Sequence, residues 1–65
     1  MTAAERRALR KAARVLREYA EDLRERHTLQ GEWDPDDPGA QRSYDRDTRL
    51  AEQLERMAKR ASATG

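Results

Sequence analysis

The chain has 65 residues and no cysteine, which excludes disulfide bonds and thiolate-bound zinc as sources of stability. Phenylalanine is also absent, and no apolar run approaches the length of a membrane-spanning helix or of a signal-peptide core. We therefore expect a cytoplasmic chain that does not act at a membrane.

Large apolar side chains are scarce, because the hydrophobic set makes up 35% of the chain and much of that set is alanine. Charged residues make up 42%. A chain this short, with so few large side chains, is hard to stabilise as an isolated monomer. We therefore expect a homo-oligomer.

The net charge of +1 hides a strong segregation of charge along the chain. Six basic residues against one acidic residue give residues 1–17 a charge of +5, whereas two against eight give residues 18–39 a charge of −6. Six basic and four acidic residues leave residues 40–65 at +2. This bipolar field differs from that of a general nucleic-acid binder, which is uniformly basic.

The first part of the chain is predicted to form a helix over about residues 3–27. Thr2 is a suitable N-cap, and Glu5 three residues later completes a capping box. The apolar residues then recur every three or four positions, as in a helix that packs against another. The seam consists of Leu9, Ala13, Leu16, Ala20 and Leu23, and it is widened on one side by Ala8, Ala12, Val15 and Tyr19. A stripe of this width can contact both the second helix and another protomer.

A second helix is predicted over about residues 40–61, with a frayed tail at 62–65. It begins either at Pro38, with Asp37 as N-cap, or a few residues later at Ser43. Its seam holds Leu50, Leu54 and Met57 with Ala51, Ala58 and Ala61, and Tyr44 and Asp47 fall on the same arc.

Residues 28–39 contain both prolines and form the predicted elbow, in which Asp34-Pro35-Asp36-Asp37 suggests a short helical turn. The expected fold is all-α: a single domain, 1–65, forming an antiparallel helical hairpin that assembles into a homo-oligomeric bundle. The large side chains expected in the core or the oligomer interface are Leu9, Leu16, Tyr19, Leu23, Leu50, Leu54 and Met57.

Arginine is concentrated on one edge of each predicted helix. The first edge includes Arg10, Arg14 and Arg17, and the second holds Arg42, Arg46, Arg49, Arg56 and Arg60. Like charges four residues apart oppose helix formation by about 0.2–0.5 kcal/mol per pair. Two explanations remain open. The arginines form salt bridges with acidic residues of a neighbouring protomer, or they bind an anion, because guanidinium groups bind phosphate bidentately.

His27 is the only histidine, and it lies either as a favourable cation at a helix end or as a donor in a ligand site. Asp47 lies in an apolar arc and is expected to pair with His27 or with an arginine. Trp33 and Tyr44 either close a small core at the elbow or form a platform on which a nucleobase stacks.

Nothing in the sequence indicates catalysis, a metal or a cofactor. The acidic residues at 32–37 lack the spacing of a calcium loop, and no glycine-rich phosphate loop or metalloprotease motif is present. We therefore expect a binding protein that is not an enzyme.

Several short motifs resemble those of small uncharacterised proteins encoded by phages and prophages. They are Leu23-Arg-Glu-Arg-His-Thr, Gly31-Glu-Trp-Asp, Ala40, Tyr44-Asp and Leu50-Ala-Glu-Gln-Leu, and together they cover about residues 20–58. The resemblance implies a phage accessory protein acting in the infected bacterial cell. Such proteins often antagonise host defence, and several form compact helical oligomers that sequester cyclic nucleotide signals.

The leading hypothesis from the sequence is a homo-oligomer that sequesters a nucleotide-derived signal between protomers. Its expected ligand-binding residues are Arg10, Arg14, Arg17, His27, Trp33, Arg42, Tyr44, Arg46 and Arg49. The alternatives are a helical hairpin that inhibits a host defence enzyme by direct binding, and an accessory protein that binds nucleic acid. The acidic middle of the chain argues against the last of these.

Overall fold

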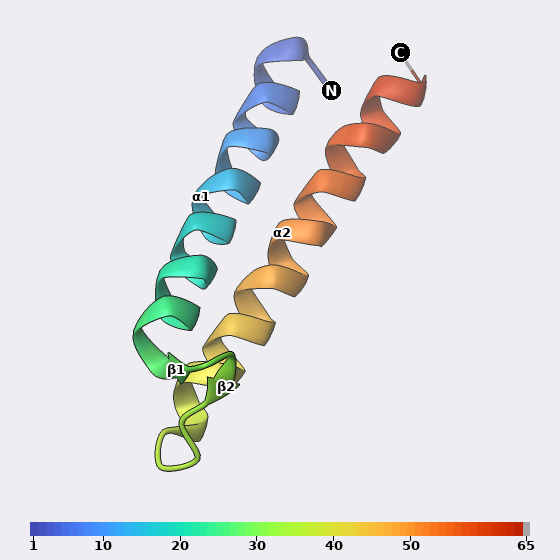
Figure 1. Cartoon of the computed structure of the whole chain (residues 1–65). Helices are drawn as coiled ribbons and strands as arrows, with labels where there is room; N and C mark the ends of the chain where they lie inside the picture. The colour runs from blue at the N-terminus through green and yellow to red at the C-terminus, as the bar shows by residue number, and fades with distance from the viewer. Residues whose placement is uncertain (65) are drawn as a thin grey trace.

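A computed structural model of the chain describes residues 1–64, with side-chain surroundings described up to residue 61. It contains helix α1 (Ala3–His27), strands β1 (Thr28–Leu29) and β2 (Glu32–Trp33), and helix α2 (Pro38–Thr64). The helices lie antiparallel, with the two strands at one end (Figure 1). The body is 46 Å long and 16 by 13 Å across. The predicted helical hairpin is confirmed, and the small sheet was not predicted.

Helix α1 begins and ends where the local signals place it. The Thr2 hydroxyl accepts a hydrogen bond from the Glu5 amide at 3.1 Å, and the Glu5 carboxylate accepts one from the Thr2 amide at 3.4 Å, which completes the capping box. At the other end, the Thr28 hydroxyl donates to the Arg24 carbonyl. This bond satisfies one of the carbonyl groups that a helix end leaves without an intrahelical partner.

Helix α2 begins at Pro38, the earlier of the two expected starts. Proline is well tolerated at the first helical position, because its missing N–H would have no partner there. The helix runs to Thr64, three residues past the expected end. Gly65 lies outside the described residues.

The centre of the hairpin is filled by alanine. Ala13 and Ala20 of α1 and Ala51 and Ala58 of α2 are each at most 1% exposed. Each pair is seven residues apart and therefore lies on the line along which its helix faces the other. The spacing between packed helices depends on the side chains at the contact, so the alanine methyl groups allow a close approach.

Within the single hairpin, the large side chains expected in the core or the oligomer interface do not form the centre of the core, and their place in an oligomer interface stays a prediction. Leu9, Leu16, Leu23 and Leu54 flank the alanine seam and are only half-buried. Tyr19, Leu50 and Met57 are 61%, 42% and 40% exposed. The physical reason is that two helices in contact along alanine enclose little space, and longer side chains then extend past the contact line.

Candidate ligand-binding surface

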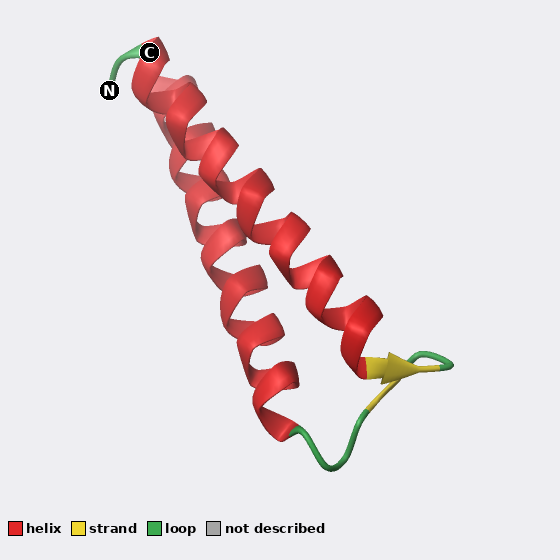
Figure 2. Ribbon diagram, turned by 90° about the vertical axis from the view of Figure 1, so that its left-hand side faces the viewer, coloured by secondary structure: helices red, strands yellow, loops and turns green. Residues whose placement is uncertain are grey.

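The elbow is a β-hairpin followed by a tight turn, and it projects beyond the helices (Figure 2). Thr28 pairs with Trp33 and Leu29 with Glu32 in antiparallel register. Gln30 and Gly31 between them have φ values of 56° and 84°. Two consecutive positive φ values are typical of the type I′ turn that joins strands through two residues. Gly31 fits the second position of this turn, but the residue before it is usually asparagine, aspartate or glycine, and here it is Gln30.

A second turn leads from the sheet into α2. The Asp34 carbonyl accepts from the Asp37 amide at 3.1 Å, and the Asp34 carboxylate accepts from the Asp36 amide at 2.9 Å. Pro35 occupies the position in the turn where its fixed φ is favoured. The expected helical turn at 34–37 is therefore a β-turn, and this segment fixes the direction in which α2 leaves the elbow.

Trp33 and Tyr44 pack against each other, with ring centroids 5.2 Å apart and planes tilted by 57°. Both side chains are half-buried. The contact joins β2 to α2, so it supports the interpretation of a small core at the elbow. Trp33 also lines an open hollow of about 520 Å³ at the elbow, together with His27, Leu29 and Pro35.

His27 pairs with a different carboxylate from the one that the sequence suggested. Its Nδ1 lies 3.2 Å from an oxygen of Asp37, which ties the end of α1 to the start of α2. Asp47 is only 16% exposed and lies 3.5 Å from the Arg46 guanidinium. Asp47 was expected to pair with His27 or with an arginine, and it pairs with Arg46. The carboxylate beside His27 is that of Asp37.

Arg17 forms a bidentate salt bridge with Glu55 across the two helices, with N–O distances of 2.8 and 2.7 Å. Hydrogen bonding and the charge of Arg17 lower the pKa of Glu55 below its ordinary value. The same hydrogen bonds raise the pKa of Arg17. Arg17 therefore has an internal partner, which its assignment to a ligand site did not foresee.

Arg14 of α1 lies among acidic side chains. Arg14 and Arg17 line an open hollow of about 420 Å³ whose other residues are Glu18, Glu21, Asp22 and Glu25. Arg10 lies on the same side of α1 as Arg14 and Arg17. This surface is a mixture of charges within one chain, so it offers less attraction for an anion than the sequence pattern suggested.

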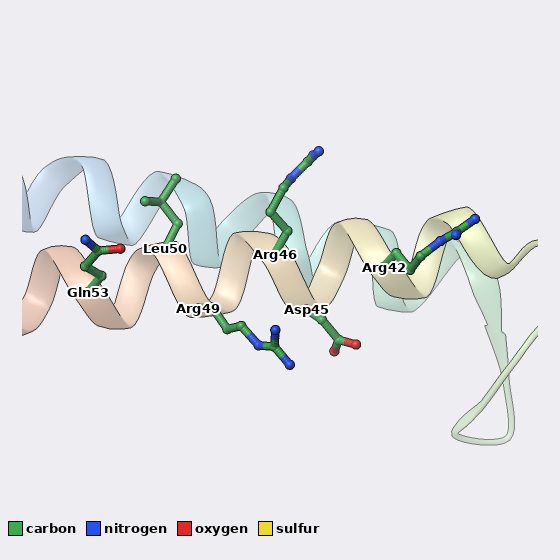
Figure 3. Close-up of a pocket in the computed structure, with 6 residues that line it drawn as sticks. All are labelled: Arg42, Asp45, Arg46, Arg49, Leu50 and Gln53. Atoms are coloured by element: carbon green, nitrogen blue, oxygen red, sulfur yellow. The ribbon is translucent and has the colours of Figure 1, made fainter.

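The arginine edge of α2, defined here as Arg42, Arg46 and Arg49, is more uniform. All three line an open hollow of about 550 Å³ with Asp45, Leu50 and Gln53. Figure 3 shows their side chains spread along the helix, with Arg46 on one side and Arg49 on the other. Arg42 and Arg49 make no ion pair with the part of the chain that is described.

The two groups of arginines lie on opposite sides of the molecule. Arg46 and Glu55 are nine residues apart, which places them half a turn out of phase on α2. Because Glu55 contacts Arg17, the arginines of α1 lie on the side away from the arginine edge. A single chain therefore does not bring the predicted ligand-binding residues together in one site.

Within residues 1–64, the histidine and acidic side chains form no group of three or more that could hold a metal ion. Neither described helix carries an apolar stretch that would span a bilayer. No family model, curated protein or solved structure matches the chain.

Proposed function

We propose that the chain is a non-enzymatic binding protein that holds a phosphate-bearing nucleotide on the arginine edge of α2. The observation that carries this proposal is the charge at Arg42 and Arg49. Both side chains are exposed and line one hollow with Arg46, and neither is neutralised by an ion pair in the described chain. An anion with more than one phosphate supplies the missing counter-charge along the helix.

The same hollow provides groups suited to a nucleobase. The Gln53 amide has both donors and acceptors for a base edge. The aromatic rings of Trp33 and Tyr44 contact each other and do not line this hollow. In the proposed site they therefore shape the elbow, and the arginines make the main contacts.

The motif resemblance to phage-encoded proteins suggests a role for this nucleotide binding during infection of a bacterial cell. A cyclic oligonucleotide that signals infection carries several phosphates, and a protein that binds it lowers its free concentration. The proposed function is thus the sequestration of a defence signal, with no chemical step. It requires an affinity that competes with the signal's receptor.

Titration of the protein with cyclic di-AMP tests the proposal. The double variant Arg42→Gln/Arg49→Gln is expected to weaken binding at least about tenfold, which corresponds to roughly 1.4 kcal/mol. The matched control is Arg24→Gln/Arg26→Gln, which removes the same charge from arginines that already have acidic neighbours. Equal loss in both variants, or no binding of cyclic di-AMP at micromolar protein, contradicts the proposal. Mass analysis of small molecules released by denaturing the purified protein extends the search to other nucleotides.

A second candidate function is direct inhibition of a host defence enzyme through the elbow. Leu29 is 80% exposed and is held out by the β-hairpin next to the hollow at the elbow. An apolar side chain exposed beside a hollow is a feature of surfaces that contact another protein. If this function holds, Leu29→Ser abolishes inhibition of the enzyme without changing nucleotide binding. Inhibition that survives the substitution contradicts it.

A further inference from the structure

One face of the hairpin is apolar and uncovered. Arg17 and Glu55 form their salt bridge on the face opposite to this one. A residue two positions away from either of them along its helix is rotated by about 200° and therefore projects to the uncovered face. The uncovered face is formed by Ala12, Val15, Tyr19, Leu50 and Met57. Tyr19, Leu50 and Met57 are 61%, 42% and 40% exposed. The helices meet along alanine, so these larger apolar side chains stay outside the contact and on this face.

The charges of the folded chain are separated along its length. Because the helices are antiparallel, residues 1–17 lie beside residues 50–64 at one end, and residues 18–49 form the elbow end. Nine basic and three acidic residues give the first end +6, whereas five basic and ten acidic residues give the elbow end −5. The hairpin is therefore a strong dipole along its 46 Å axis.

We propose that a second copy of this chain covers the apolar face, in the antiparallel orientation that places the two elbows at opposite ends. The product is a four-helix bundle with a two-fold axis perpendicular to the helices. In this orientation the basic end of each copy lies over the acidic end of the other. The alternative, with the elbows together, places each end over an end of the same net charge.

The charges along α1 agree with this orientation. Residues 1–17 carry a charge of +5, whereas residues 18–27 carry two basic and four acidic residues. An antiparallel copy brings the basic half of one α1 beside the acidic half of the other.

The assembly deepens the proposed function, and this step rests on that function. In the antiparallel bundle the two α2 helices lie side by side, so their arginine edges flank one groove. Arg42 and Arg46 of one copy then lie near Arg60 of the other copy's α2. A ligand with two or more phosphates neutralises both edges at once, and it therefore stabilises the dimer while it binds.

Sedimentation equilibrium over a range of protein concentrations tests the dimer. We expect a dimer whose dissociation constant rises at least about tenfold in Tyr19→Glu. The control is Leu29→Glu, which places the same charge on a more exposed apolar residue outside the face and leaves the dissociation constant unchanged. A wild-type monomer at all concentrations, or a Tyr19→Glu variant that dimerises as well as wild type, overturns the proposal.

The orientation is tested separately on a fully folded protein. The chain has no cysteine, so Leu29→Cys carries a single spin label at the elbow. Elbows at opposite ends give a label-to-label distance on the order of the 46 Å length of the body. A distance below half that length overturns the antiparallel arrangement. This measurement remains decisive if Tyr19→Glu fails to fold.

The ligand step has its own readout. Cyclic di-AMP is expected to lower the dissociation constant of the dimer about tenfold, and Arg42→Gln/Arg49→Gln is expected to remove this effect. A dimer with separated elbows that does not respond to cyclic di-AMP contradicts the nucleotide site and leaves the assembly standing. A monomer that binds cyclic di-AMP contradicts the assembly and leaves the nucleotide site standing.

Discussion

Replacing Ala51 by leucine tests whether the alanine seam determines the distance between the helices. Ala51 is 0% exposed, so the three added carbon atoms of Ala51→Leu must enter the contact between α1 and α2. In open space, their burial would stabilise the fold by about 2.4 kcal/mol, at about 0.8 kcal/mol per carbon. In a close-packed contact, such an insertion instead costs about 1–3 kcal/mol, because backbones and rotamers must shift.

We expect the second outcome, with a loss of about 1–3 kcal/mol in the free energy of unfolding. In a domain this small, each kcal/mol lowers Tm by roughly 4–8 °C. Thermal and urea unfolding followed by circular dichroism, at one fixed protein concentration, measure the effect. The control is Ala4→Leu, which makes the same replacement at an exposed position of α1 outside the apolar face and leaves stability unchanged or raised.

The result that would refute this reasoning is specific. If Ala51→Leu unfolds at the same temperature as wild type or higher, the seam has room for a large side chain. The half-burial of the flanking leucines would then have a different cause from the close approach of the helices.

Three further substitutions test the remaining contacts. Arg17 lowers the pKa of Glu55, so the ionised Glu55 stabilises the fold at pH values above its unfolded-state pKa. This stabilisation is lost as the pH falls through the folded-state pKa. In urea unfolding, Glu55→Gln should therefore lower the free energy of unfolding at neutral pH and make it less dependent on pH in the acid range. Gly31 has φ of 84°, so Gly31→Ala should lower the free energy of unfolding by about 1–2 kcal/mol, although nothing lies within 4 Å of the added carbon. Trp33→Ala should cost about 0.5–1.5 kcal/mol beyond lost burial, through its contact with Tyr44, and should remove the near-ultraviolet dichroism while helix content is kept.

Each of these predictions has a contrary outcome. An unchanged pH profile in Glu55→Gln would mean that the salt bridge is not maintained in solution. A Gly31→Ala variant as stable as wild type would mean that the turn has another conformation. A large loss of helix in Trp33→Ala would mean that the elbow core supports the whole hairpin.

Much of the fold follows from local signals in the sequence. Thr2 with Glu5 placed the start of α1, and Asp37-Pro38 marked one of the two starts considered for α2, because caps depend on a few neighbouring residues. The β-hairpin at 28–33 was missed because Gln30-Gly31 lacks the usual asparagine or aspartate of its turn type. Two-residue strands also carry too little alternation to be recognised.

The core and the site were harder to predict than the elements. Leucine and alanine share the same heptad seam, and periodicity alone does not say which of them occupies the contact line. The partners of Arg17 and His27 depend on how the antiparallel helices align and on where the elbow places Asp37. Such pairs are separated by many residues, and spacing along one helix gives no information about them.

The alanine seam also determines how the fold responds to temperature. Unfolding raises the heat capacity in proportion to the apolar surface that becomes exposed. Five buried alanines and a set of half-buried leucines contribute little of that surface. The single hairpin should therefore have a heat-capacity change below the usual ~12–15 cal/mol/K per residue, and a stability curve that is low and nearly flat. Association through the apolar face would bury more apolar surface and would therefore increase the heat-capacity change of unfolding and the curvature of the stability curve. Calorimetry at increasing protein concentration should then detect assembly as a larger heat-capacity change.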